Sequence, residues 1–193
     1  EAGGFRADVI GEDMELIVRL HPKLSARGQR YRVTFVPDPV CWTDAPEDLG
    51  TLGKQRKRWQ RGLAESLWEN RGLCFARGSG TAGWLAFPYF VVFELLSPVI
   101  EVGGLVVMAV AWALGMMNGA GFLAFAVAAF ALGVMLSTTA ILLEELSFHT
   151  YPKARHVLVL FLVSIVENFG YRQVISIWRL QALFGWIMGR EIK

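Results

Sequence analysis

Two acidic side chains stand together where a helix is expected to begin. Glu12 and Asp13 follow Gly11 and precede a stretch in which apolar residues recur between charged ones. A carboxylate at the mouth of a site can accept a proton from an alcohol that lies within hydrogen-bond reach. Acid pairs are also common as simple capping groups at helix starts. At this point both interpretations stand, a general base and a helix cap.

A second group of side chains combines an amide, a guanidinium and an indole. Gln55, Arg58 and Trp59 are spaced so that all three share one face of a helix. A guanidinium can clamp a diphosphate through two parallel hydrogen bonds. An indole offers a flat apolar surface on which a sugar ring can stack. The alternative is a basic helix that only touches anionic lipid headgroups.

Ionisable and amide side chains also interrupt the apolar second half of the chain. Such groups are costly at membrane depth and usually face a bundle interior or a wet path. They predict either a polar conduit or pairing between helices, for example of Glu167 with Arg172. The set is Glu94, Glu101, Glu144, Glu145, Glu167, Asn168, Arg172 and Gln173.

The composition indicates a polar head followed by a membrane tail. Of the 193 residues, 54% are hydrophobic and only 19% are charged, which is too apolar for an ordinary soluble domain. Residues 1–80 hold 13 of the 19 Lys and Arg and 11 of the 17 Asp and Glu. We therefore expect residues 1–80 to belong to a cytosolic catalytic domain and residues 81–193 to form a transmembrane region. The two cysteines, Cys41 and Cys74, suggest neither a metal site nor a disulfide framework.

The head is expected to contain a helix, strands and a second helix. Residues 12–28 read as a helix that ends near Gly28, because apolar and charged residues alternate with helical spacing and acids lie in the first turn. Residues 31–36 alternate and are rich in β-branched and aromatic side chains, which predicts a strand. Residues 40–43 are a candidate for a second short strand.

The second helix is expected over residues 46–70. Asp44 is a candidate N-cap, Glu47 would close a capping box, and Pro46 suits the first turn. Its basic centre and apolar stripe are typical of a helix that lies at the membrane surface.

Three long apolar segments follow, each near or above the roughly 20 residues that cross a bilayer. The basic loop 147–156 favours the cytosolic side, whereas three crossings would put the C-terminal end outside despite its basic residues. Either the first segment contains two passages or the tail lies along the interface. The segments span roughly residues 85–116, 119–143 and 157–178.

Taken together, these motifs resemble the membrane-bound, processive-type glycosyltransferases of family 2. That family includes cellulose, hyaluronan, chitin and poly-N-acetylglucosamine synthases. The likeness rests on Glu12-Asp13 followed by Gln55-x-x-Arg58-Trp59 and then by membrane helices, and residues 35–47 and 167–180 add to it. It implies a mixed fold. The chain would be the C-terminal piece of an α/β nucleotide-sugar transferase domain, with an amphipathic interfacial helix and an α-helical membrane bundle of about three segments.

The resemblance implies an inverting transfer from a nucleotide sugar, usually a UDP-sugar, to a hydroxyl of a growing polysaccharide or lipid-linked acceptor. Asp13 matches the family's catalytic base, and Glu12 precedes it in the motif. Gln55 and Arg58 match residues that hold the donor diphosphate, and Trp59 matches the residue that stacks on the acceptor sugar. The implied location is the cell (inner) membrane, multi-pass, with the catalytic part cytosolic. Membrane lipid is an expected partner, and nucleic acid is not.

Two departures from the family pattern matter. Gly11 stands where these enzymes usually carry Thr. The family's Asp-x-Asp metal motif is absent, and Asp38-Pro39 is no substitute. We therefore expect the ligands of Mg²⁺ or Mn²⁺ upstream of this chain, no metal site within it, and no activity of the chain in isolation. The first residue is not Met, which suggests a fragment.

Two other classes of protein share some of these features. A non-enzymatic membrane scaffold or transporter segment with a basic interfacial helix would explain the apolar segments, although a transporter should show paired broken helices in two halves. A family 2 enzyme that glycosylates lipid or protein would share every site residue. The products would identify the latter, because it would release short glycolipid instead of long chains.

Overall fold

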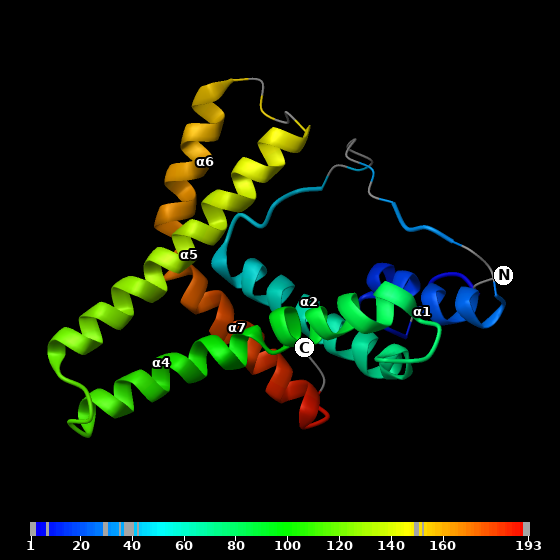
Figure 1. The fold of residues 1–193 in the computed structure, drawn as a ribbon, viewed down its shortest axis with the longest axis horizontal. Helices are drawn as coiled ribbons and strands as arrows, with labels where there is room; N and C mark the ends of the chain where they lie inside the picture. The colour runs from blue at the N-terminus through cyan, green and yellow to red at the C-terminus, as the bar shows by residue number, and fades with distance from the viewer. Residues whose placement is uncertain are drawn as a thin grey trace. The chain divides into compact units, whose positions relative to one another are not determined.

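The computed structural model describes residues 3–6, 8–28, 31–34, 36, 41, 43–148, 151 and 153–190. Over this part of the chain the regular structure is helical and contains no strand. The chain divides into two compact units (Figure 1). The first unit comprises Glu1–Ile100 with Ser176–Lys193, and the second comprises Glu101–Ile175.

The expectation of a mixed fold that includes an α/β domain piece is therefore wrong. Residues 31–34, 36, 41 and 43 carry no regular structure, and the rest of the two expected strands, residues 35, 37–40 and 42, lies outside the described residues. A strand needs a neighbour to bond its N–H and C=O groups. The described residues offer no such partner, so the alternating pattern of this segment is not enough to form a strand.

Helix α1, Glu12–Ala26, confirms the first expected helix. The acids of its first turn, Glu12, Asp13 and Glu15, favour the positive end of the helix dipole. The chain turns out of the helix at Gly28, where φ is +65° and the N–H donates to Ser25 O at 3.0 Å. Only glycine adopts that φ without strain, so the predicted stop signal is correct.

Helix α2, Leu49–Glu69, begins later than expected, because the N-cap is Asp48 and not Asp44. The Asp48 carboxylate accepts hydrogen bonds from Thr51 Oγ1 at 2.6 Å and Thr51 N at 2.8 Å. These bonds hold the pKa of Asp48 below its usual value. Asp44 and Pro46 precede the helix.

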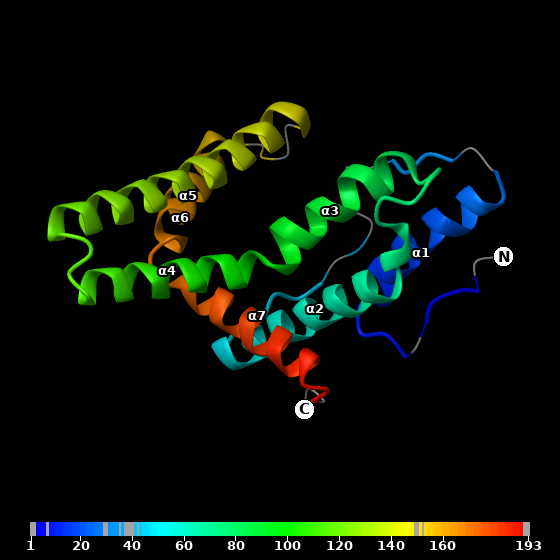
Figure 2. The same cartoon turned by 60° about the horizontal axis from the view of Figure 1, so that its bottom comes forward.

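The core of the first unit lies between α1, α2 and the segments that follow α2. These are η1 (Arg71–Leu73), η2 (Ala82–Ala86), α3 (Phe87–Tyr89) and η3 (Phe90–Leu95). Side chains from α1 pack against a buried apolar cluster that α2 dominates. Figure 2 shows α1 and α2 packed against each other. The buried members of the cluster are Leu63, Leu67, Leu73 and Phe87.

A buried proline interrupts the next helical stretch. Residues of η2 and η3 form wide π-helical turns, and α4, Ser97–Ala113, begins after a break. Pro98 has no N–H, and its ring excludes the usual helical bond to the carbonyl of Glu94. Arg179 Nη2 instead donates to Glu94 O at 2.6 Å, and Gln60 Nε2 donates to Leu95 O at 3.0 Å. Side chains from α2 and α7 (Tyr171–Ile187) thus satisfy the freed carbonyls.

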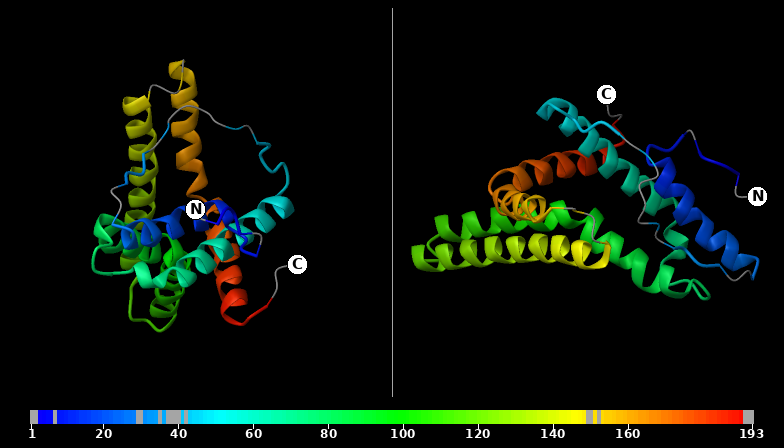
Figure 3. Two further views of the ribbon diagram at one scale, coloured as in Figure 1. Left: turned by 90° about the vertical axis from the view of Figure 1, so that its right-hand side faces the viewer. Right: turned by 90° about the horizontal axis from the view of Figure 1, so that it is seen from above.

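The second unit is built on a pair of packed helices, α5 (Gly119–Phe148) and α6 (Ala154–Glu167), which Figure 3 shows side by side. Its polar side chains are paired across helices. Ser137 Oγ donates to Glu167 Oε1 at 3.0 Å, and Arg172 Nε lies 3.2 Å from Glu101 Oε1. Polar side chains of different helices therefore do pair, but the predicted pairing of Glu167 with Arg172 is wrong.

One helix of the described chain, α5, is long and apolar enough to cross a membrane. Two further stretches pass the same test only as pairs bent by more than 40° at a short break. They are Ala82–Leu95 with Ser97–Ala113, and Ala154–Glu167 with Tyr171–Ile187. The three expected apolar segments thus correspond to one straight helix and two bent pairs.

Candidate active site

The start of α1 is pressed against α2 at two glycines. A Cβ atom on Gly62 would lie 2.8 Å from Gly11 N and 3.0 Å from Gly11 Cα. Such distances leave no room for a side chain, so the two backbones are in direct contact. Because Glu12 and Asp13 follow Gly11 directly, the backbone that carries this acidic pair continues from a point of contact with α2.

The contact lies on the face of α2 that carries the second motif. Gly62 follows Arg58 by four positions, Trp59 by three and Gln55 by seven, and residues at these spacings share a helix face. At about 1.5 Å per residue, Arg58 lies about 6 Å from Gly62 along the helix axis. The structure thus places Gly11, the residue before the acidic pair, against the helix that carries the Gln-x-x-Arg-Trp motif. In the described part of the chain, no hydrogen bond or ion pair joins Asp13 to that face.

The residues expected to contact substrate are accessible. Glu12 and Asp13 are exposed, and Asp13 Oδ1 accepts a hydrogen bond from Met14 N at 2.8 Å. On α2, Arg58 is exposed, Gln55 is half-buried, and Trp59 is 54% exposed. An acceptor hydroxyl could therefore reach Asp13 without displacing any core residue.

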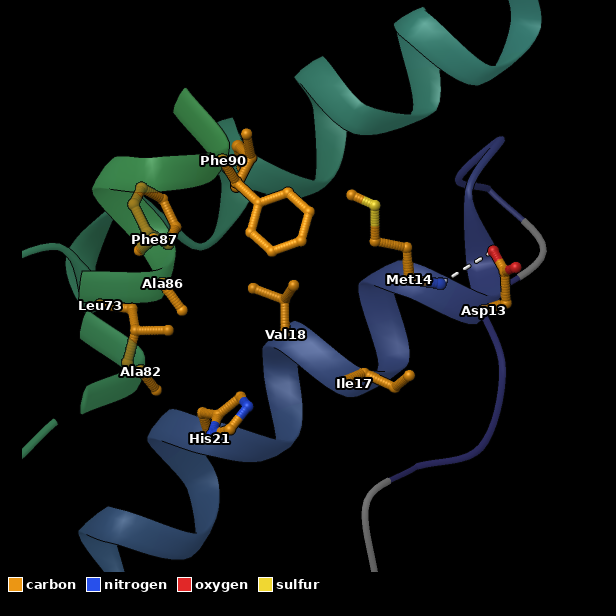
Figure 4. Close-up of a pocket in the computed structure, with 11 residues that line it drawn as sticks. Asp13, Met14, Ile17, Val18, His21, Leu73, Ala82, Ala86, Phe87 and Phe90 are labelled. Carbon is orange, nitrogen blue, oxygen red and sulfur yellow. Dashed lines mark hydrogen bonds between the residues drawn. The ribbon is translucent and has the colours of Figure 1, made fainter. Parts of the chain in front are cut away.

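Asp13 also stands at the end of an apolar cavity of about 340 Å³, shown in Figure 4. His21 is the other ionisable residue in its wall; its Nδ1 lies 2.8 Å from the Tyr31 hydroxyl, and burial lowers its pKa. The wall offers few groups that could hydrogen-bond a sugar, so polar substrate is expected on the exposed side of Asp13. The remaining lining residues are Met14, Ile17, Val18, Leu67, Leu73, Ala82, Ala86, Phe87 and Phe90.

Two buried polar contacts of the first unit were not foreseen from the sequence. Glu15 is fully buried and pairs with Arg19 at 2.8 Å, and Arg19 Nη2 donates to Gly4 O at 2.7 Å. Their spacing of four positions could have revealed that pair. Gln60, 2% exposed, accepts from Arg179 Nε at 2.7 Å. No sequence signal joins residues 119 positions apart.

The described residues do not fit a divalent-cation site. They contain no group of three or more His, Cys, Asp or Glu side chains that could hold a metal ion. Asp38 lies outside the described residues. A site for Mg²⁺ or Mn²⁺ upstream of this chain stays a prediction.

Comparisons with known proteins give a consistent result. The sequence matches the family described as Glycosyl transferase family group 2 over residues 1–187. It is 40% identical over 67 residues to a poly-beta-1,6-N-acetyl-D-glucosamine synthase of Staphylococcus aureus (strain COL), and 34% identical over 67 residues to the enzyme of that name from Staphylococcus epidermidis (strain ATCC 35984). Each alignment covers 35% of this chain and 15% of the relative, so the chain spans a small part of these relatives. No solved structure matches the chain.

Proposed function

The chain belongs to Glycosyl transferase family group 2, and we propose that it takes part in moving a sugar from a nucleotide-sugar donor to a hydroxyl group of a glycan or lipid-linked acceptor. The observation that carries the proposal is the contact between Gly11 and Gly62. It supports the proposal because it joins the residue before a solvent-accessible carboxylate pair to the helix that carries an amide, a guanidinium and an indole. These are the groups that such a transfer requires.

In the proposed reaction Asp13 is the general base. The acceptor oxygen attacks the anomeric carbon while its proton passes to the Asp13 carboxylate. The bond from the anomeric carbon to the phosphate oxygen breaks, the configuration at that carbon inverts, and the nucleoside diphosphate leaves. Glu12 is exposed beside Asp13 and helps to orient the acceptor in this proposal.

The face of α2 supplies the binding groups in this proposal. Gln55 and Arg58 hold the donor diphosphate, and the guanidinium charge stabilises the leaving group as negative charge develops on it. Trp59, with its exposed indole, stacks on the acceptor sugar. Holding donor and acceptor in line supplies much of the rate enhancement.

The relatives suggest which substrate to test first. Their printed name is that of a synthase of poly-beta-1,6-N-acetyl-D-glucosamine. We therefore propose UDP-N-acetylglucosamine as the first donor and a β-1,6-linked N-acetylglucosamine chain as the first acceptor. A lipid-linked acceptor remains the second candidate.

We also propose that the protein works at the cytosolic face of the cell membrane. Helix α5 is long and apolar enough to cross a bilayer. The bent pairs that contain α4 and α7 would add two crossings if each is one span. The basic, amphipathic α2 would then lie along the cytosolic interface.

The test is release of UDP from a panel of UDP-sugars by the complete membrane protein, with Asp13→Asn and Asp44→Asn compared with the wild type. Asp44 is an exposed aspartate that precedes α2 and serves as the control. Release by the wild type and by Asp44→Asn, but not by folded Asp13→Asn, would support the proposed base and name the sugar. No release with any donor from folded wild-type protein would favour the non-enzymatic scaffold.

A further inference from the structure

One face of the Trp59 indole is covered by a neighbouring side chain. The Arg56 guanidinium carbon lies over the ring, 4.7 Å from its centroid. The two residues are three positions apart on α2, so the contact spans one helical turn. A cation over the face of an indole is attracted by the negative charge of the π-system.

The stack is the contact that orients Arg56. Its Nε is buried and has no hydrogen-bond partner among the described residues. Arg56 is half-buried, whereas Arg58 is exposed. The two arginines therefore differ in environment, although both lie in the same basic stretch of α2.

The covered face decides how a ligand can approach Trp59. An aromatic ring has two faces, and a guanidinium occupies one of them here. The side chain nevertheless remains 54% exposed, which leaves surface on the ring available to a ligand. A ring held by a stack also loses less conformational freedom when a ligand binds.

We propose that Arg56 is a positioning residue that fixes the Trp59 indole so that an acceptor sugar stacks on its uncovered face only. This inference rests on the proposed function, in which Trp59 contacts the acceptor. It assigns Arg56 to acceptor recognition and leaves the donor diphosphate to Gln55 and Arg58.

The chain contains a matched control for this contact. Arg71 lies over the ring of Trp68, also 4.7 Å from the centroid. Trp68 is exposed to a similar extent, 57%, near the end of α2 and away from the Gln55–Trp59 face. Removing Arg71 therefore removes a stack of the same length, together with the hydrogen bond from Arg71 Nη1 to Trp68 O at 2.8 Å, without touching the proposed acceptor platform.

The experiment measures initial rates of the complete protein with the UDP-sugar that supports UDP release, and with added short oligosaccharides of that sugar as acceptors. For Arg56→Met we expect the KM for acceptor to rise about two- to fivefold, in line with the strength of a cation–π contact, with the KM for donor unchanged. Arg56→Lys keeps the charge and should give a smaller rise. Arg71→Met should leave both KM values unchanged, and Arg56→Met should have no further effect when Trp59 is already alanine.

Four outcomes would overturn the inference. A rise in donor KM with an unchanged acceptor KM would make Arg56 a diphosphate contact. Equal effects of Arg56→Met and Arg71→Met would point to packing of α2 in general. An unchanged acceptor KM in Arg56→Met, while Trp59→Ala raises it, would remove Arg56 alone from acceptor recognition. If Trp59→Ala itself leaves acceptor KM unchanged, the acceptor role in the proposed function fails, and the role of Arg56 fails with it.

Discussion

Gly11 and Gly62 touch through their backbones, and this contact joins the start of α1 to the middle of α2. A Cβ atom on Gly11 would lie 3.3 Å from the Cα and carbonyl carbon of Gly62. Neither glycine has a side chain to hold the two backbones apart, which permits this contact. The relation between the acidic pair and the α2 face depends on it.

Gly62→Ala should therefore damage both stability and activity. Its Cβ would meet backbone atoms of Gly11 at 2.8 and 3.0 Å, and backbone cannot rotate away as a flexible side chain can. Overpacking of this kind typically costs about 1–3 kcal/mol. We expect a Tm lowered by several degrees and transfer reduced at least tenfold, measured on the detergent-purified protein.

The control for that substitution is Gly72→Ala, because a Cβ at Gly72 has no neighbour within 4 Å. It should leave Tm and activity close to those of the wild type. An unchanged Tm and transfer rate in Gly62→Ala would mean that α1 and α2 can separate without consequence. That result would contradict a proposed site that depends on their contact.

Gln60→Leu should destabilise the first unit. The substitution removes the acceptor of Arg179 Nε and the donor to Leu95 O, both within the buried break near Pro98. Each buried group left without a partner costs about 1–3 kcal/mol. Thermal unfolding should show a clear fall in Tm, whereas Gln181→Leu, at an exposed position of α7, should not. Similar Tm values for the two variants would contradict the role given to Gln60.

The local sequence pattern was enough to predict α1. Its apolar spacing, the acids of the first turn and Gly28 all lie within the helix or next to it. The predicted start of α2 was wrong because two aspartates are candidates for its N-cap position. Asp48 prevails over Asp44 because Thr51, three residues on, donates through both its N–H and its hydroxyl.

Contacts between distant residues could not be predicted in this way. The expected strand over 31–36 needed a partner strand, which no pattern within the segment can supply. The bond from Arg179 to Gln60 joins residues 119 positions apart. The site residues were chosen from motif resemblance, and the contact of Gly11 with Gly62 is a feature that only the fold reveals.

Stability should depend on pH through His21. Burial lowers its pKa in the folded protein, so the unfolded chain, with a His pKa of about 6.5, binds the proton more readily. The folded protein therefore loses stability as the pH falls below about 6.5. This loss of stability stops once the pH is below the pKa of His21 in the folded protein. In His21→Gln the Tm should fall less between pH 7 and pH 5 than in the wild type.

His156→Gln provides the comparison for that titration, since His156 is also half-buried but lies in α6. Calorimetry at matched ionic strength would follow all three proteins. A pH dependence in His21→Gln as steep as that of the wild type would show that other groups are responsible for it.

Gly133 provides space for a polar side chain of the second unit. A Cβ there would lie 2.4 Å from Asn168 Oδ1 and 3.1 Å from Arg172 Nη1. Asn168 is 6% exposed, and its Nδ2 donates to Ser164 O at 2.6 Å, so it has little freedom to move. Gly133→Ala should lower the Tm by several degrees.

The same substitution should be harmless once Asn168 is shortened. In an Asn168→Ala background the close contact is gone, and Ala is favoured over Gly in a helix by about 1 kcal/mol. The changes in Tm caused by the two substitutions should therefore be strongly non-additive. The control is Gly103→Ala, whose Cβ meets nothing within 4 Å. Its change in Tm should simply add to that of Asn168→Ala. Additive effects of Gly133→Ala and Asn168→Ala would show that the two residues are not in contact.

Helix α5 should cross the membrane once. Its 30 residues extend about 45 Å at 1.5 Å each, which exceeds a hydrocarbon core of about 30 Å. Lys153 and Arg155 follow its C-terminal end and favour the cytosolic side. In a variant with Cys41 and Cys74 replaced by serine, Met116→Cys should react with a membrane-impermeant maleimide in intact cells. Arg155→Cys should react only after the cells are opened; labelling of both positions, or of neither, in intact cells would exclude a single crossing by α5.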